Sequence, residues 1–422
     1  MLRSLLLACL FGNIVKAQQL VLIGGGLTDG NTDVWNKVVE LAGGRGVAKI
    51  GIFTTASADP ADSATYYLDM FVNTYGAASA VHIPVTETSN NANDQEIADL
   101  IRQQTGFFFG GGDQLRVTKA LKNLDGSDTL ALLTLKQVFQ DGAVVGGTSA
   151  GTACMGSTFM ITSGRPYDSL VYGSYSGGPD PVYPDDLTYD ENGGLGLLNG
   201  YIPDTHFSER GREARLIRLL QDTKNAVGGV TKGFGVDEDT ALVIYNVGSN
   251  EEIGEVIGAS GGVFFVDVSR LVSLPSETVD YSDIVTTFLT SGDTINLQTG
   301  EVTFAPWKTP LKGDEYYDNA LSSKDILSSM VDAEWRYIAK RLFDNTFDDS
   351  VLSTSRERNP VQFTVKMDRI NGNAYGGYLT DGTFIVSYTD LFVAIYESAF
   401  SRASRTEKII KHVHKRNLKT ET

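Results

Sequence analysis

The sequence predicts an α/β fold, with a mostly parallel sheet flanked by helices and an added β-rich α+β region toward the C-terminus. Two observations carry this prediction. Short apolar runs alternate with helix-like stretches over the first two-thirds of the 422 residues, and such alternation is typical of a parallel sheet with helices on both faces. Glycines also follow several of the runs, which span residues 20–23, 48–54, 81–85, 107–109 and 144–148.

The glycine-rich segments lie where a ligand would bind. In open parallel sheets, ligands bind outside the carboxyl ends of the strands. Gly24–Gly26 and Gly110–Gly112 directly follow apolar runs, so both segments are expected at that edge. Neither completes a Walker A motif or a dinucleotide-binding Gly-x-Gly-x-x-Gly motif. The sequence therefore disfavours nucleotide binding at these loops.

Ser149 is the candidate nucleophile. It stands at the centre of a Gly-Thr-Ser-Ala-Gly sequence at 147–151, between an apolar run and a stretch of small residues. This Gly-x-Ser-x-Gly pattern is typical of a nucleophile elbow, in which a tight turn from strand to helix exposes one hydroxyl. Backbone amides near such a serine can stabilise an oxyanion. The candidate donors are Ala150, at the start of the expected helix, and Gly111 or Gly112.

His206 is the candidate general base for Ser149. A serine nucleophile needs a positioned base, which is most often a histidine. The chain has four histidines, and two of them, His412 and His414, belong to a basic C-terminal tail. His82 lies inside an apolar run and is interpreted as a core or edge residue. His206 instead follows a glycine-rich approach and precedes a cluster of arginines.

The acid that would orient His206 is expected after the serine turn. Asp168 is the nearest carboxylate on that side of Ser149. Further acids crowd the same loop region, so several alternatives stay open: Asp180, Asp185, Asp186, Asp190 and Glu191.

Arginines follow His206 at positions that local rules disfavour. If a helix begins at Ser208, Arg212 and Arg215 lie on its apolar, inward-facing stripe. A buried guanidinium is costly unless an anion satisfies it, and cations in the first turn oppose the helix dipole. We therefore interpret the arginines as a site for an anionic group. The alternative is that Asp204 or another carboxylate pairs with them and only braces the strand end.

The character of the sequence changes after about residue 270. An apolar stripe that includes Trp335 and Ile338 predicts a helix. Two alternating runs, at 361–367 and 383–396, predict strands. We divide the chain into a secretion signal at 1–17, a catalytic domain at 18–270, a C-terminal extension at 271–400 and a basic tail at 401–422.

The N-terminus and the charge favour a secreted protein. Residues 1–17 combine an early arginine, a short apolar stretch and a small-residue exit, which is typical of a secretion signal; the alternative is a buried first strand. Removing them changes the formal net charge from −17 to −19, and so acidic a protein disfavours nucleic acid and anionic membranes as partners. The same step leaves Cys154 as the one cysteine, so no internal disulfide is expected. One histidine in the site and no cysteine cluster disfavour zinc, and no cofactor is expected.

Three ordered motifs resemble the cyanophycinases, which belong to a serine peptidase family that also includes aspartyl dipeptidase E. They are Gly110–Gln114, the serine motif at 147–151 and an Asp-x-His-Phe-x-x-Arg-x-Arg-x-x-Arg pattern at 204–215. The segment 233–241 is similar to the family as well, and the resemblance covers roughly residues 18–270. It implies a flavodoxin-like fold akin to class I glutamine amidotransferases, with Ser149 as nucleophile.

The resemblance also implies His206 as base and the hydrolysis of β-linked aspartyl peptide bonds. Thr205 stands where the bacterial enzymes often carry glutamine, and aligning the family's acid with Asp168 needs a one-residue insertion. The residues that would help to hold a β-aspartyl-arginine unit are Gln114, Asp204, Thr205, Arg210, Arg212 and Arg215.

We therefore expect a secreted serine hydrolase of the cyanophycinase type that cleaves β-aspartyl-arginine linkages through an acyl-enzyme. The expected partner is a peptide, and the sequence leaves open whether the chain forms a homodimer. Three alternatives stay open: an aspartyl or isoaspartyl dipeptidase of the same family, an α/β-hydrolase esterase, and a catalytically silent binding protein. Only 57 residues separate Ser149 from His206, which leaves little room for the elements that an α/β-hydrolase has between them.

Overall fold

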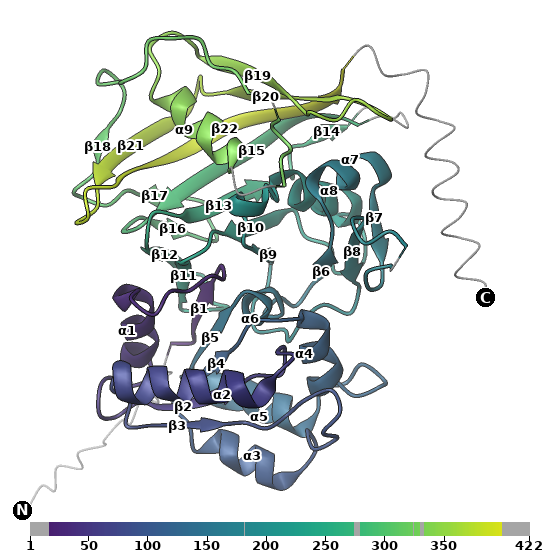
Figure 1. The fold of residues 1–422 in the computed structure, drawn as a ribbon, viewed down its shortest axis with the longest axis vertical. Helices are drawn as coiled ribbons and strands as arrows, with labels where there is room; N and C mark the ends of the chain where they lie inside the picture. Colours follow the sequence, from purple (N-terminus) through teal and green to yellow (C-terminus); the bar gives the residue numbers. More distant parts are fainter. Residues whose placement is uncertain (1–16, 181, 274–278, 324, 330–332, 399–422) are drawn as a thin grey trace, which may run out of the picture.

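Two large sheets organise the molecule (Figure 1). The computed structural model describes residues 17–180, 182–273, 279–323, 325–329 and 333–398. Within them, a nine-stranded sheet contributes the parallel strands in the lower part of Figure 1, and a ten-stranded sheet fills the upper part. A small sheet beside them contains β6 (Met160–Ser163), β8 (Leu187–Asp190) and β7 (Ser174–Ser176).

The nine-stranded sheet contains the parallel strands that the sequence predicts. Five neighbouring strands run parallel, and four more continue the sheet with antiparallel pairing. All five apolar runs fall on the parallel strands, although the run at 81–85 overlaps only the end of its strand. The order is β17 (Val302–Thr303), β16 (Thr294–Asn296), β12 (Ile253–Gly258), β11 (Thr240–Tyr245), β1 (Gln19–Ile23), β5 (Val144–Thr148), β4 (Gly106–Phe109), β2 (Lys49–Phe53) and β3 (Ser79–His82).

Helices cover both faces of the parallel strands, as β4 illustrates. Phe107 and Phe109 are buried in a core with α3 and α5, whereas Phe108 points to the other face and stacks on Trp35 of α1. This alternation buries both sides of the strand. The helices of this part are α1 (Thr32–Leu41), α2 (Pro60–Asp69) with a π-helical turn (Met70–Thr74), α3 (Gln95–Arg102), α4 (Gln114–Leu121), α5 (Leu130–Gln140) and α6 (Ala150–Ala153).

The ten-stranded sheet joins the C-terminal region to the rest of the chain. The boundary expected at residue 270 falls between β13 (Gly262–Asp267) and β15 (Asp280–Thr290), which are hydrogen-bonded neighbours. Residues after it therefore extend a sheet that begins before it. The strands in order are β18 (Thr309–Pro310), β21 (Asn373–Tyr378), β22 (Phe384–Glu397), β15 (Asp280–Thr290), β13 (Gly262–Asp267), β10 (Lys232–Val236) and β9 (Tyr201–Thr205). In addition, β14 (Val272–Ser273) pairs with β15, β20 (Phe363–Asp368) with β22, and β19 (Ser350–Thr354) with β20.

One apolar core lies against the ten-stranded sheet and includes residues from both sides of position 270. Phe207 and Leu216 from the earlier part share it with Trp335, Ile338 and Tyr388. The helices that contribute are α7 (Pro166–Tyr172), α8 (Glu213–Thr223) and α9 (Glu334–Phe343), and a 3₁₀ turn, η2 (Ser208–Arg210), precedes α8.

One helix and two strands of the C-terminal region lie where the sequence predicts them. The expected helix is α9, and the two expected strands correspond to β20 and β22, so these predictions are confirmed. Cys154 is buried, and burial raises the pKa of its thiol to about 12, as suits a packing residue. No helix among the described residues is long and apolar enough to cross a membrane. The signal at 1–17, apart from its last residue, and the basic tail at 401–422 lie outside the described residues.

Candidate active site

Ser149 sits on a strained turn at the carboxyl end of β5. It caps the short helix α6 with φ 55° and ψ −116°, a region that residues other than glycine rarely adopt. The neighbouring glycines make the turn possible. A Cβ on Gly147 would lie 2.3 Å from the carbonyl oxygen of Gly151, and a Cβ on Gly151 would lie 2.3 Å from that of Phe109. The geometry is therefore that of a nucleophile elbow, with its hydroxyl exposed beyond the strand.

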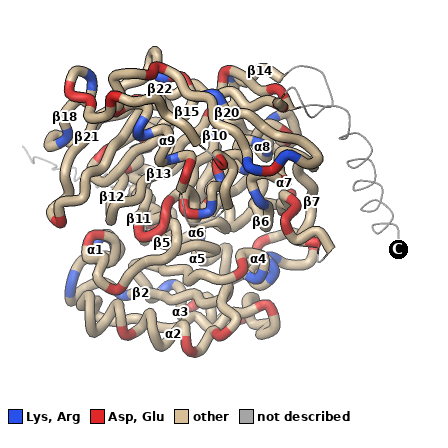
Figure 2. Tube along the Cα trace, turned by 45° about the horizontal axis from the view of Figure 1, so that its top comes forward, with Lys and Arg blue, Asp and Glu red and all other residues tan. Residues whose placement is uncertain are grey.

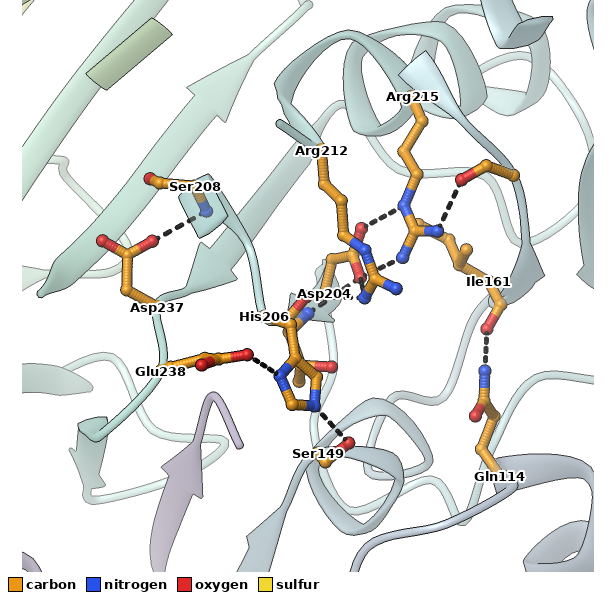
Figure 3. Close-up of polar contacts among 12 residues, drawn as sticks. Gln114, Ser149, Ile161, Asp204, His206, Ser208, Arg212, Arg215, Asp237 and Glu238 are labelled. Carbon is orange, nitrogen blue, oxygen red and sulfur yellow. Dashed lines mark hydrogen bonds and ion pairs between the residues drawn. The ribbon is translucent and has the colours of Figure 1, made fainter. Parts of the chain in front are cut away.

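A histidine and a glutamate form a hydrogen-bonded chain with this serine (Figure 3). Ser149 Oγ lies 2.8 Å from His206 Nε2, and His206 Nδ1 lies 2.6 Å from Glu238 Oε1. His206 follows β9 directly, and Glu238 comes two residues after β10. Because β9 and β10 are parallel neighbours, their carboxyl ends bring the imidazole and the carboxylate together. The serine comes from one sheet, and its two partners come from the other.

Glu238 occupies the position that the sequence prediction gave to Asp168, and this prediction is corrected by the geometry. Asp168 lies in the first turn of α7. Burial and the neighbouring Asp185 raise its pKa to about 6, while Arg165 lowers it in part. Proximity along the chain after Ser149 was a misleading guide, because the acid arrives through strand pairing. The available signal was the segment 233–241, where three consecutive acids follow a strand.

Burial lowers the pKa of His206 below its usual value. The hydrogen bond that His206 donates to Glu238 opposes this effect, while Arg210 and Arg212 add to it. A depressed pKa favours the neutral imidazole, which is the form that can accept a proton from Ser149.

The first glycine segment makes room for the base. A Cβ on Gly25 would lie 2.3 Å from the imidazole of His206, and the His206 amide donates to the carbonyl of Gly24 at 2.7 Å. The glycine segment after β1 of the nine-stranded sheet is therefore hydrogen-bonded to His206, which follows β9 of the ten-stranded sheet. The sequence predicts a ligand beside Gly24–Gly26. In the structure, the imidazole of His206 lies against Gly25 instead.

Two backbone amides near the serine are available to an oxyanion. Ala150 is the first residue of α6, and within the described part of the chain its amide has no hydrogen-bond partner; the same holds for Gly112. Gly112 adopts φ 140°, and a Cβ there would lie 2.0 Å from the carbonyl oxygen of Ala56. Gly111, the third expected donor, also lies beside Ser149, since a Cβ on Gly111 would lie 3.3 Å from the serine Cβ. A hydrogen bond from its amide reaches the Tyr67 hydroxyl, whose pKa burial raises and this bond partly lowers.

Arg215 is held by an acid of the protein. Its Nε and Nη2 donate to the two carboxylate oxygens of Asp204 at 2.8 and 2.6 Å, and both side chains are almost fully buried. Burial opposes ionisation of Asp204, but Arg215 and Arg212 outweigh it and lower its pKa. The helix begins at Glu213 and not at Ser208 as expected. Asp204 thus braces the strand end, which was the structural alternative for this pair.

Arg212 contacts the segment that carries the base. Its Nη1 donates to the carbonyl of Thr205 at 2.6 Å and to Asp204 Oδ1 at 3.3 Å. Burial and the neighbouring Arg215 lower its pKa to about 9. Thr205 itself is buried, and its amide donates to Asp204 Oδ1 at 2.8 Å. In Figure 3 the guanidinium of Arg212 lies close to His206.

A cavity of about 830 Å³ extends from these arginines to the C-terminal region. Its lining includes Arg210 and Arg212 from the segment after His206. Arg356 and two acids, Asp325 and Glu357, line it from the C-terminal region. Neither Arg210 nor Arg356 makes an ion pair through its guanidinium with any residue that the structure describes. The cavity therefore offers both positive and negative groups to a ligand.

Gln114 lies across the site from the acid. Its Nε2 donates to the carbonyl of Ile161 at 2.7 Å, and Figure 3 shows it on the far side of Ser149 from Glu238. Among the described residues, no group of three or more His, Cys, Asp or Glu side chains is placed to hold a metal ion.

Comparisons with known proteins identify the family of this chain. Residues 20–251, more than half of the chain, match Peptidase family S51. A cyanophycinase from Synechococcus elongatus is 29% identical over 262 residues, which are 60% of this chain and 71% of the relative. A cyanophycinase from Geminocystis herdmanii is 31% identical over 252 residues, covering 58% of this chain and 80% of the relative. A peptidase of known structure from an acI-B1 Actinobacterium is 18% identical, with a TM-score of 0.46, and covers 67% of this chain and 98% of its own.

The family match includes Ser149, His206 and Glu238. The chain belongs to Peptidase family S51 and is a serine peptidase similar to the cyanophycinases.

Proposed function

We propose that this peptidase acts on peptides built of β-aspartyl-arginine units and cleaves the bond that joins one unit to the next, with Ser149 as nucleophile, His206 as general base and Glu238 as the acid that orients it. The observation that carries the proposal is the chain of two short hydrogen bonds, 2.8 Å from Ser149 Oγ to His206 Nε2 and 2.6 Å from His206 Nδ1 to Glu238 Oε1. Such a chain activates a hydroxyl that is otherwise a weak nucleophile.

The chemistry follows from the positions of these groups. Ser149 Oγ attacks the carbonyl carbon of the substrate, and its proton passes to His206 Nε2. Glu238 stabilises the resulting imidazolium, while the amides of Ala150 and Gly112 stabilise the oxyanion. The imidazolium then donates its proton to the leaving amine, and an ester with Ser149 remains. His206 next takes a proton from water, which hydrolyses the ester and restores the serine.

The cavity beside the site supports the choice of substrate. A β-aspartyl-arginine unit carries a guanidinium and a carboxylate group. The cavity lining supplies both charges that such a unit needs, with Arg210 and Arg212 for the carboxylate and Asp325 and Glu357 for the guanidinium. The relatives that match this chain are named cyanophycinases. We propose that the cavity holds the arginine branch while the peptide carbonyl faces Ser149.

We also propose that the enzyme acts outside the cell. This part rests on residues 1–17, whose composition is typical of a secretion signal. Expression of the full chain, followed by N-terminal sequencing of the secreted product, tests it. A product that begins near residue 18 supports the proposal, and retention of the intact chain in the cytoplasm contradicts it.

One assay tests the activity. The chain from residue 18 onward is incubated with insoluble cyanophycin, a β-Asp-Arg peptide, an isoaspartyl dipeptide, casein and a nitrophenyl ester, each beside the Ser149→Ala variant. We expect an arginine-containing dipeptide to be released from the polymer by the wild-type chain alone. Cleavage of only the isoaspartyl dipeptide would identify a dipeptidase instead. Ester turnover without any peptide cleavage would overturn the proposal, as would activity that survives in Ser149→Ala.

A further inference from the structure

Arg336, near the start of α9, binds two acids directly behind the catalytic pair. Its Nη1 donates to Asp237, and it also lies 3.2 Å from Glu209 Oε1. Asp237 immediately precedes Glu238, and Glu209 lies in the 3₁₀ turn three residues after His206. A single guanidinium of the C-terminal region thus contacts both segments that carry the base and its acid. Figure 2 shows basic and acidic residues gathered between α9 and β10.

Glu209 and Asp237 in turn accept hydrogen bonds from backbone amides of the site. Glu209 Oε2 accepts a hydrogen bond from the amide of Glu238 at 3.1 Å. Asp237 Oδ1 accepts one from the amide of Ser208 at 2.9 Å, and its Oδ2 accepts one from Gly262 at 3.0 Å. Each carboxylate therefore holds the loop of the other strand, and Arg336 holds both carboxylates.

Charge explains why the arginine is needed there. Asp237 is fully buried, and Glu213 beside it is 1% exposed, with no hydrogen-bond partner for its Oε2 among the described residues. Burial and Asp237 raise the pKa of Glu209 to about 7, and Arg336 opposes the rise. Burial likewise raises the pKa of Glu213 well above its usual value. Arg336 therefore offsets the repulsion between Asp237 and Glu209 when both carboxylates are ionised.

The position of Arg336 in its helix also favours a specific role. Arg336 lies in the first turn of α9, where the helix dipole disfavours a cation. Residues that go against local structural preferences tend to lie at functional sites. The next residue toward the N-terminus, Trp335, packs edge-on against Phe264 with ring centroids 6.5 Å apart, and Phe264 stacks on Phe207 at 5.2 Å. Phe207 directly follows His206, so α9 reaches the base by a second, apolar route.

We propose that Arg336 is a positioning residue for the His206–Glu238 pair, and that α9 is part of the catalytic machinery although it lies outside the residues that match the peptidase family. Arg336 touches neither the serine nor the pair itself. It acts through Asp237 and Glu209, which fix the backbone from which the imidazole and its carboxylate project. Small displacements of such groups are costly, since a shift of about 1 Å can reduce a rate about 100-fold.

The test uses two readouts that do not depend on the peptide substrate. The first is the low-field proton NMR signal of the short His206–Glu238 hydrogen bond, assigned by its loss in His206→Gln. The second is the rate at which a fluorophosphonate probe labels Ser149, measured across pH. In Arg336→Met we expect the NMR signal to disappear and labelling to slow about 10-fold to 100-fold. The midpoint of the pH profile should also move downward, because the Glu238 hydrogen bond raises the pKa of His206 while burial, Arg210 and Arg212 lower it.

Arg341→Met is the matched control. It removes a guanidinium from the same helix, but one that stacks on Tyr317 at 4.1 Å and donates to the Tyr337 hydroxyl. We expect its NMR signal and labelling rate to equal those of the wild-type chain. Arg336→Lys keeps the charge without the planar fork that serves two carboxylates, so we expect it to recover part of the labelling rate lost in Arg336→Met.

The outcomes separate this inference from the proposed function. If Arg336→Met does not fold, Arg336→Lys decides, and a folded Arg336→Lys that keeps the full signal, rate and pH profile overturns the inference. A wild-type chain that cleaves no β-aspartyl peptide removes the proposed substrate and leaves this inference intact. A wild-type chain that the probe does not label removes the proposed nucleophile, and the NMR signal then tests Arg336 alone.

Discussion

The nucleophile and the base are built in different ways. Ser149 stands on the nine-stranded sheet and depends on five consecutive residues, because the glycines around it permit the strained turn. His206 and Glu238 stand on the ten-stranded sheet and depend on the pairing of two parallel strands. Residues as distant as Arg336 complete that second arrangement. A local motif thus supplies the attacking atom, whereas tertiary structure supplies the groups that activate it.

The largest effect should come from separating the base from its acid. Glu238→Gln keeps the size of the side chain but removes the charge that stabilises the imidazolium, so we expect turnover to fall about 10³-fold to 10⁴-fold. The measurement is the rate of β-aspartyl peptide cleavage, with circular dichroism to show that the variant is folded. A Glu238→Gln enzyme within a few-fold of wild type would return the role of the acid to a residue nearer Ser149 in sequence.

The pH dependence tests the environment of the base. His206 accepts a proton only when it is neutral, and burial together with Arg210 and Arg212 lowers its pKa below 6.5. Activity should therefore rise with pH, reach half its maximum below pH 6.5, and fall about 10-fold per unit below that midpoint. In Arg212→Met the midpoint should move to higher pH, because a neighbouring positive charge has been removed. A wild-type midpoint above pH 6.5 would contradict this description.

The contrast between a local motif and long-range strand pairing also explains which parts of the fold could be predicted from the sequence. The parallel strands were found because each is apolar on both faces, as Phe107, Phe108 and Phe109 show. The ten-stranded sheet was not foreseen. It pairs β15 with β22 across about a hundred residues, with Val285 opposite Phe392, and no local pattern encodes such a partner.

In the site, Ser149 was readable because an elbow is a short pattern, and His206 because few histidines compete with it. Glu238 was missed because it lies 32 residues after His206 and joins it through a neighbouring strand. The arginines gave a correct signal of an unusual environment, but the sequence could not tell which anion satisfied each one. Arg215 proved to pair with Asp204, eleven residues earlier.

The wall of the cavity contributed by the C-terminal region should affect substrate binding more than chemistry. Arg356 is exposed on that wall, and an exposed ion pair contributes up to about 1 kcal/mol. We therefore expect Arg356→Ala to raise KM for an arginine-containing substrate about 2-fold to 5-fold, with kcat unchanged. Lys366→Ala, which alters a charge on β20 away from the cavity, serves as the control. An unchanged KM in Arg356→Ala would confine recognition to the residues that match the family.

The smallest effect on activity is expected at Asp168, where the consequence should be one of stability. Its pKa is raised to about 6 by burial and by Asp185, so the folded chain binds this proton more tightly than the unfolded chain does. Stability from this group is therefore complete below about pH 4 and is lost as the pH rises through 6. The side chain in Asp168→Asn stays neutral at every pH, so this variant does not lose that stability as the pH rises. We expect the free energy of unfolding to increase by about 1–2 kcal/mol at pH 8, after allowance for solvent screening of a partly exposed group, and to change little at pH 4. Urea unfolding at the two pH values measures the difference, and peptide cleavage at pH 8 should stay within about 2-fold of wild type. Loss of cleavage in a stable Asp168→Asn enzyme would show that the acid nearest the serine in sequence takes part after all, and that the base depends on more than the pairing of β9 with β10.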